Sequence, residues 1–317
     1  MYSSRYDTHI IYSQPQQIHL SLGPSKSDII VTWVTFNQTE SSLVKFGNCQ
    51  LDKWALPGSA TLFTDSGPEK RQMYIHRVII NDLKPGVKYR YRCGSREGWS
   101  AIYAFTTLKN DSNWSPRIAV YGDLGNVLAE SLGPLQEEAQ QGMYDMIMHL
   151  GDFAYDLIDD NARVGDEFFR QIETMAAYVP YQACPGNHEY HYNFSNYNNR
   201  FSMMSESNNM INNNYWSYNI GPAHIIALST EFYYYIKYNL GDGVSEMKAQ
   251  YEWLENDLIE ANKAENRQKR PWIITMAHRP PYSLFPDDNI RLGYKSSDGL
   301  RHYGLEELFY KYGSSIC

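Results

Sequence analysis

Side chains that commonly ligate metals follow four apolar runs in the C-terminal two-thirds of the chain. RIAVY and MIMHL each lead into a Gly-Asp pair, YQAC leads into GNHE, and WIITMA leads into a histidine. The residues concerned are Asp123, Asp152 with Tyr155, Asn187 with His188, and His278. A single Asp or His after a strand is usually structural, but four such positions together predict a site.

Oxygen and nitrogen donors of this kind favour iron, zinc or manganese over a soft metal. Two ions about 3.5–4 Å apart need a bridging carboxylate, and together they clamp a phosphate for in-line attack. We expect Asp152 to be the bridge and Asp123 to serve one ion. Asn187 and His278 would serve the other ion, and His188 would act on the substrate.

Alternating strand and helix patterns from about residue 117 onward predict an α/β domain. Residues that follow parallel strands gather at one edge of the sheet, which is where we expect the site. Helices are expected near Ala129–Gln141, Asp166–Ala177, Ser245–Asn262 and Leu305–Tyr312, a hairpin over Tyr215–Thr230, and a polar, asparagine-rich loop after GNHE.

The N-terminal third has a different pattern, with short β-branched and aromatic runs between turn signals. The main runs are DIIVTWVTF, SSLVKFG, YIHRVIINDL, KYRYRCG and SAIYAFTTL. They predict an antiparallel β-sandwich resembling a fibronectin-III module, in which a tyrosine pins the corner of LKPGVKYRYR. KNDSNWSP reads as a linker. The predicted fold class is therefore α+β with two domains, a sandwich over residues 1–110 and an α/β domain over residues 111–317.

GDLG, GDFAY, GNHE and MAHRPPY together resemble the metallophosphoesterase motifs in their purple acid phosphatase form, over about residues 14–312. The tyrosine of GDFAY is the distinguishing feature, and the sandwich is similar to that of the larger animal and plant-like branch. The resemblance implies that Asp123 and Tyr155 bind Fe(III) and that Asp152 bridges. It also implies that Asn187 and His278 bind divalent Fe, Zn or Mn, that His188 assists catalysis, and that small phosphate monoesters are hydrolysed at acidic pH.

Two alternatives remain open at this point. One is a phosphodiesterase or nucleotide pyrophosphatase on the same dinuclear scaffold. The other is a non-enzymatic binding role for the sandwich. The family pattern continues with a strand carrying Gly-His-x-His, whereas this chain ends at EELFYKYGSSIC with His302 as its last histidine. We therefore expect the catalytic domain to be truncated at its C-terminal end, before that strand, and the 317-residue chain to be poorly active.

The composition narrows the possible partners. A net charge of -8 and a pI of about 5.6 argue against nucleic-acid binding. No apolar run is long enough to span a membrane, and the N-terminus lacks signal-peptide features. Four Asn-x-Ser/Thr sequons still favour a secreted or lysosomal glycoprotein, and a homo-oligomer is possible. We expect His149 to be structural, whereas Arg279 could meet either a phosphate or an acidic neighbour.

Overall fold

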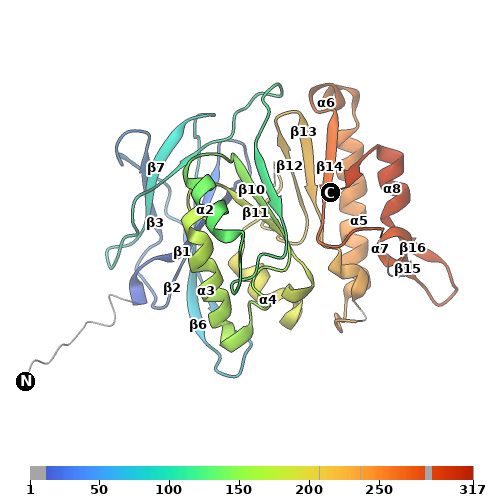
Figure 1. The fold of residues 1–317 in the computed structure, drawn as a ribbon, viewed down its shortest axis with the longest axis horizontal. Coiled ribbons are helices and arrows are strands. Elements are labelled where there is room, and N and C mark those ends of the chain that lie inside the picture. Colours follow the sequence, from blue (N-terminus) through green and yellow to red (C-terminus); the bar gives the residue numbers. More distant parts are fainter. Residues whose placement is uncertain (1–11, 207, 236, 283–287, 317) are drawn as a thin grey trace, which may run out of the picture.

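The computed structural model describes residues 12–206, 208–235, 237–282 and 288–316. Most of the N-terminal stretch assessed for a signal peptide lies outside these ranges, as does Cys317. Figure 1 shows the N-terminal strands at one end of the molecule and the central α/β elements beside them. At the opposite end, α5 (Gly243–Ala261) and α8 (Leu305–Tyr312) lie beyond β14 (Trp272–Met276). Among the described residues, no helix is long and apolar enough to cross a bilayer.

The N-terminal strands form two four-stranded antiparallel sheets that face one another as a sandwich. One sheet runs β1 (Gln16–Leu22), β2 (Ile29–Thr35), β6 (Gln72–Ile80) and β5 (Ser59–Thr64); the other runs β4 (Lys53–Trp54), β3 (Leu43–Gly47), β7 (Lys88–Gly94) and β8 (Tyr103–Thr106). All five predicted runs contain strands. The corner is also as expected, because the hydroxyl of Tyr89 accepts the backbone N–H of Lys84 at 3.0 Å.

Three parallel strands begin the α/β region, in the order β11, β10, β9. Their bounds are β9 (Ile118–Tyr121), β10 (Met146–Leu150) and β11 (Tyr181–Cys184), joined through α2 (Leu132–Gln140) and α3 (Asp159–Ala176). Residues 160–162 of α3 have left-handed backbone angles, so the regular helix begins after them. The central β10 is buried along nearly its whole length, which explains its apolar sequence.

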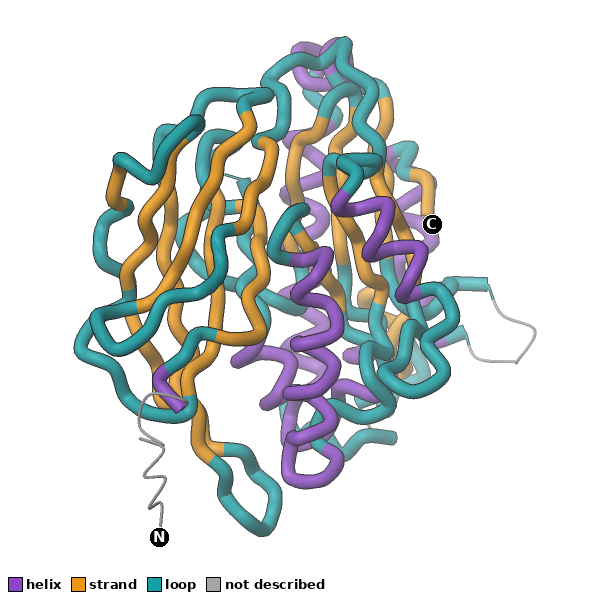
Figure 2. The backbone as a smooth tube through the Cα atoms, turned by 60° about the vertical axis from the view of Figure 1, so that its left-hand side comes forward, coloured by secondary structure: helices purple, strands orange, loops and turns teal. Residues whose placement is uncertain are grey.

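Four further strands form a second sheet in the order β12, β13, β14, β17, visible beside the first in Figures 1 and 2. It contains β12 (Trp216–Ile220), β13 (Ala223–Ala227), β14 (Trp272–Met276) and β17 (Ser315–Ile316). The intervening elements are η2 (Glu231–Tyr234), α5 (Gly243–Ala261), α6 (Ala264–Lys269), α7 (Asn289–Leu292), β15 (Gly293–Lys295), β16 (Arg301–Tyr303) and α8 (Leu305–Tyr312). Among them, β15 pairs with β16 in a separate two-stranded sheet.

This arrangement corrects one expectation. The four strand ends do not share one sheet edge, because β14 belongs to the second sheet and the other three strands belong to the first. The last described residues, Ser315 and Ile316, pair in parallel with Ile274 and Thr275 of β14. The expected truncation before a strand carrying Gly-His-x-His stays a prediction.

The segment after GNHE is also helical where a loop was expected. After the 3-10 turn η1 (Asn187–Glu189), α4 runs over His191–Arg200, with left-handed backbone angles at residues 192–194. Tyr197 lies in the regular part of the helix, Phe194 and Phe201 flank that part, and all three rings are buried. Packing of these rings outweighs the weak helix propensity of the intervening asparagines.

The sandwich is joined to the α/β region by buried polar contacts. The backbone N–H of Ile18 in β1 donates to Glu173 of α3 at 3.1 Å, and that of Leu22 donates to the Gln182 side chain of β11 at 2.8 Å. Tyr91 of β7 donates to the carbonyl of Ala177 at 2.8 Å. Through these hydrogen bonds the sandwich supports α3 and β11, which belong to the three-stranded part of the α/β region. The boundary at residues 110 and 111 stays a prediction.

Candidate metal centre

Asp123 and Asp152 sit in equivalent positions, each two residues beyond a parallel strand of the first sheet. Both have positive φ, 55° and 53°, a conformation that aspartate tolerates better than most residues. The backbone N–H of Asp123 donates to the carbonyl of Gly151 at 3.2 Å, which ties the two loops together. The paired Gly-Asp turns thus direct both carboxylates to the same end of the sheet.

Two glycines let neighbouring loops approach closely beneath these carboxylates. Gly151 has a φ of +76°, and a Cβ there would lie 2.5 Å from the backbone N and Cα of Gly186. A Cβ at Gly186 would lie 2.6 Å from the backbone nitrogen of Asp152. Side chains at either position would force apart the loops that carry Asp152 and Asn187.

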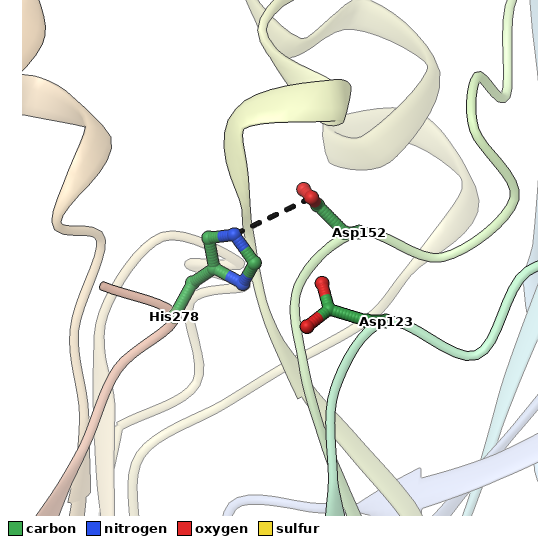
Figure 3. A group of neighbouring side chains, drawn as sticks. All are labelled: Asp123, Asp152 and His278. Carbon is green, nitrogen blue, oxygen red and sulfur yellow. Dashed lines mark ion pairs between the residues drawn. The ribbon is translucent and has the colours of Figure 1, made fainter. Parts of the chain in front are cut away.

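Asp123, Asp152 and His278 each offer one ligand atom within 4.8 Å of the others. Figure 3 shows the three side chains converging, with His278 reaching across from the end of β14 toward Asp152. Nε2 of His278 lies 3.4 Å from Oδ2 of Asp152. Its Nδ1 donates to the carbonyl of Leu150 at 2.8 Å, so the Nε2 lone pair is the one available to a metal.

Asn187 completes one side of the cluster. Its Oδ1 lies 3.3 Å from Nε2 of His278, close to the 3.4 Å between that nitrogen and Oδ2 of Asp152. Donors about 2.0–2.1 Å from one tetrahedral ion are separated by about 3.3–3.4 Å. Both distances from Nε2 of His278 therefore suit donors to one divalent ion.

Tyr155 lies on the other side of the cluster, beside Asp123. Its hydroxyl donates to Oδ1 of Asp123 at 2.9 Å, and its side chain is 43% exposed. Partial burial and the neighbouring Asp123 carboxylate raise the pKa of Tyr155 above its usual value. Both effects favour the protonated phenol when no metal is bound. The phenol and the carboxylate together offer two oxygen donors to a second ion.

Charge is concentrated around Asp152 and His278. Burial alone would lower the pKa of His278, but the hydrogen bond and charge of Asp152 outweigh it and raise the pKa to about 9. Burial likewise opposes ionisation of Asp152, yet contacts with His278 and the backbone of His188 lower its pKa overall. A metal ion bound by His278 would replace the proton on Nε2, because a histidine binds a metal in its neutral form.

His188 points toward the same cluster from η1. Its backbone N–H donates to Oδ1 of Asp152 at 2.9 Å, and its Nδ1 lies 2.7 Å from Oδ1 of Asp156. Its Nε2 lies 3.8 Å from Oδ2 of Asp152, too far for a hydrogen bond, and the side chain is 35% exposed. The ring of Tyr155 packs against it edge-on at 4.5 Å.

Two residues near the site were missed in the sequence. Asp156 orients His188, and it follows the distinguishing tyrosine directly. Glu189, which is 3% exposed, accepts the backbone N–H groups of Gly186, Asp152 and Phe153 at 2.8, 2.9 and 3.0 Å. Burial raises the pKa of Glu189 to about 7 against the pull of these donors. The glutamate of GNHE was the available signal for this brace.

The structure also shows the surroundings of three residues outside the predicted ligand set: His149, Arg279 and His302. His149 is fully buried, with Nδ1 2.5 Å from the hydroxyl of Tyr181, which fits the structural role expected of it. Arg279 meets an acidic neighbour: Nε donates to both carboxylate oxygens of Glu231, at 2.9 and 3.0 Å. His302 is exposed on β16, which pairs with β15.

A cavity of about 1040 Å³ opens beside Asp123 and His278. Pro280, Tyr282 and Phe309 line it together with the carboxylate-bearing Glu306 of α8. The cluster is thus reachable from a sizeable, mostly apolar hollow between the ends of the strands and α8.

Comparison with known families and proteins agrees with this geometry. The family described as "Purple acid Phosphatase, N-terminal domain" matches residues 15–107, and "Calcineurin-like phosphoesterase" matches residues 116–313. Acid phosphatase type 7 of Danio rerio is 48% identical, covering 96% of this chain and 69% of that protein. Purple acid phosphatase 21 of Arabidopsis thaliana is 30% identical, covering 94% of this chain and 62% of that protein.

Solved structures show the same fold. The purple acid phosphatase PPD1 from yellow lupin seeds superposes with a TM-score of 0.67 at 22% identity, over 95% of this chain and 57% of that one. The structure of PhoD gives a TM-score of 0.53 at 14% identity, over 84% of this chain and 62% of that one. With two matching domains and relatives at 48% identity, the chain belongs to the purple acid phosphatases, a family of phosphatase enzymes with a calcineurin-like phosphoesterase domain.

Proposed function

We propose that the cluster is the active site of an acid phosphatase that hydrolyses small phosphate monoesters with an Fe(III) and a divalent Fe, Zn or Mn ion. The observation that carries the proposal is the position of Asp152 among the ligand atoms of Asp123 and His278, within 4.8 Å of both. A carboxylate in that position suits a bridge between two ions. One relative, of Arabidopsis thaliana and 27% identical, is named Fe(3+)-Zn(2+) purple acid phosphatase 12.

The donor chemistry divides into two halves. Asp123 and the Tyr155 phenol, adjacent at 2.9 Å, would hold the ferric ion. Asn187 and His278, 3.3 Å apart, would hold the divalent ion. When bound, the ions would supply Lewis acidity to the phosphoryl group and activate water.

His188 would supply a proton to the leaving group. The contact of its Nδ1 with Asp156 fixes the ring, and this leaves Nε2 as the nitrogen that can face a substrate. Its partial exposure gives a substrate access to that nitrogen.

Elemental analysis and turnover of an aryl phosphate monoester at mildly acidic pH test the proposal together. We expect iron plus a second metal, a monoester turnover that is low for this 317-residue chain but well above its turnover of an aryl diester, and a visible absorption band that Tyr155→Phe removes. Tyr192→Phe, a change at another exposed tyrosine, should keep the band. A fully metallated but colourless protein, or one preferring the diester, would contradict the proposal.

We also infer a secreted or lysosomal glycoprotein. Support comes from the sequon asparagines Asn110, Asn113 and Asn193, which are all exposed. A shift in mass on glycosidase treatment of protein expressed in a secretory host tests this inference, and an unchanged mass would count against it.

A further inference from the structure

Arg279 follows the proposed ligand His278, and its side chain contacts several polar and aromatic groups beside the metal centre. One hydrogen of its Nη2 points to Oδ1 of Asn187 at 2.8 Å, and another to the hydroxyl of Tyr238 at 2.7 Å. On its other edge, Nε donates to Glu231. The guanidinium plane also lies over the ring of Tyr234, 4.4 Å from its centroid.

These contacts hold the guanidinium in one place. Glu231 is 0% exposed, so its charge needs a fixed partner inside the protein. The backbone N–H of Arg279 is also anchored, because it donates to the Thr230 hydroxyl at 3.1 Å. A planar donor group held from two sides loses little further freedom when it forms its bond to Asn187.

The bond to Asn187 has a directional consequence. An asparagine amide has an acceptor end and a donor end that exchange when the group turns by half a revolution. Arg279 can only donate, so it selects the orientation that turns Oδ1 of Asn187 toward Nη2. That same oxygen lies 3.3 Å from Nε2 of His278, where a ligand oxygen is needed. One lone pair can meet Arg279 while the other remains available to an ion.

We propose that Arg279 is a positioning residue that sets the affinity of the Asn187–His278 half of the metal centre by fixing the Asn187 amide with its oxygen inward. This inference rests on the proposed function, since it takes Asn187 as a ligand. Glu231 and Tyr238 hold Arg279, and Arg279 holds Asn187. A side chain without the donor leaves the amide free to turn its NH2 group toward the ion.

The test measures zinc binding by calorimetry. The full chain is first freed of metal with a chelator and is then titrated with zinc. Arg279→Met keeps the length of the side chain and removes every donor. We expect about a 10–100-fold loss of affinity at one of two zinc sites and no change at the other, as is usual for loss of an outer partner. Arg291→Met is the matched control, because Arg291 pairs with Asp288 and Glu306 instead.

Two further variants separate positioning from general destabilisation. Arg279→Met leaves Glu231 without its partner, so the double variant E231Q/R279M, which removes that buried charge, should show the same loss of affinity. Arg279→Lys keeps a positive partner for Glu231 but lacks the second N–H group that donates to Asn187. This variant should therefore also bind zinc more weakly at one site.

A double-mutant comparison identifies the residue through which Arg279 acts. In an Asn187→Ala background, Arg279→Met should cause no additional loss of zinc affinity. Wild-type affinity in all three Arg279 variants, or an equal loss in the Asn187→Ala background, would overturn the inference. If the unsubstituted chain binds no zinc, the proposed metal centre fails as well. Tight wild-type binding with unaffected variants defeats the Arg279 inference alone.

Discussion

Nε2 of His278 lies 3.4 Å from Oδ2 of Asp152, although one residue follows a strand of the second sheet and the other a strand of the first. The pair therefore forms only when both sheets are assembled, and it places the site between them. Asp152 also receives the backbone N–H of His188, so it connects loops from three strands. Its removal should disturb the whole cluster.

Asp152→Asn tests this central position. We expect a loss of metal affinity exceeding the roughly 10–100-fold typical of an outer partner, affecting both ions, because an amide is a poor bridge. Metal content by elemental analysis and affinity by calorimetry measure the effect. Asp145→Asn is the control: Asp145 precedes β10 at the opposite end of the strand and contacts Arg117. Loss of only one ion would contradict bridging.

Gly186→Ala tests the close approach of the loops. A Cβ there would lie 2.6 Å from the backbone nitrogen of Asp152 and closer still to its Oδ1. We expect an unfolding free energy lower by about 1–3 kcal/mol and weaker metal binding, because the loops must separate. Thermal and denaturant unfolding measure this change.

Gly133→Ala provides the comparison for the glycine substitution. Gly133 lies in α2 with nothing within 4 Å of the added carbon, so alanine should stabilise the protein by up to about 1 kcal/mol. Equal destabilisation by the two alanines would show that the contact at Gly186 is not the cause.

The sequence predicts that Asp123, Asp152 and His278 lie close together, because each of them follows an apolar strand. The apolar runs before Asp123, Asp152 and His278 leave little choice of element, and strand ends gather polar residues. The assignment of β14 to a separate sheet depends on strand pairing between distant segments. Local patterns do not specify such long-range pairing.

The supporting network is harder to predict. Glu189 sits within a recognised motif, but its role becomes clear only from the three backbone N–H groups that it accepts. Arg279 had two chemically reasonable partners in sequence, and the position of Glu231 on η2 decided between them. α4 was missed because the many asparagines around Phe194 and Tyr197 are typical of a loop.

Asp166→Asn tests the junction between the sandwich and the α/β region. Asp166 pairs with Arg200 at 3.0 Å, both fully buried, and with Arg71 at 2.7 Å. Removing the carboxylate charge leaves the Arg200 guanidinium buried without its partner, which should cost about 3–5 kcal/mol of unfolding free energy. Denaturant unfolding measures this cost.

Glu69→Gln is the control at the same junction. Glu69 pairs with Arg163 at 2.6 Å, but both groups are exposed to solvent. The melting temperature of this variant should match that of the unsubstituted protein. An equally small effect of Asp166→Asn would show that the buried Asp166 carboxylate contributes little to the stability of the protein.

We expect the free energy of unfolding to fall on acidification because of His76, which lies in the sandwich away from the metal centre. Its ring is buried, stacked on Trp33 at 4.9 Å, with Nε2 2.9 Å from the Thr35 hydroxyl and Nδ1 2.8 Å from that of Ser42. Thr35 already donates to the carbonyl of Asn37, so it accepts from Nε2–H, and Ser42 donates to Nδ1. The neutral ring is thus fully paired, and burial lowers the pKa of His76 from 6.5 to about 4.

Because the folded-state pKa lies below the unfolded value, the unfolded chain binds the extra proton between about pH 6.5 and pH 4. The stabilisation is complete above that window and is lost as the pH falls through it, by roughly 3 kcal/mol in all. Unfolding free energies measured across this range should show a smaller slope in His76→Gln, which loses the contribution of His76; the buried His19, whose pKa is also lowered to about 4, keeps its own contribution. His302→Gln, at an exposed histidine, should retain the full slope. An unchanged slope in His76→Gln would show that the buried ring is already protonated in the folded protein.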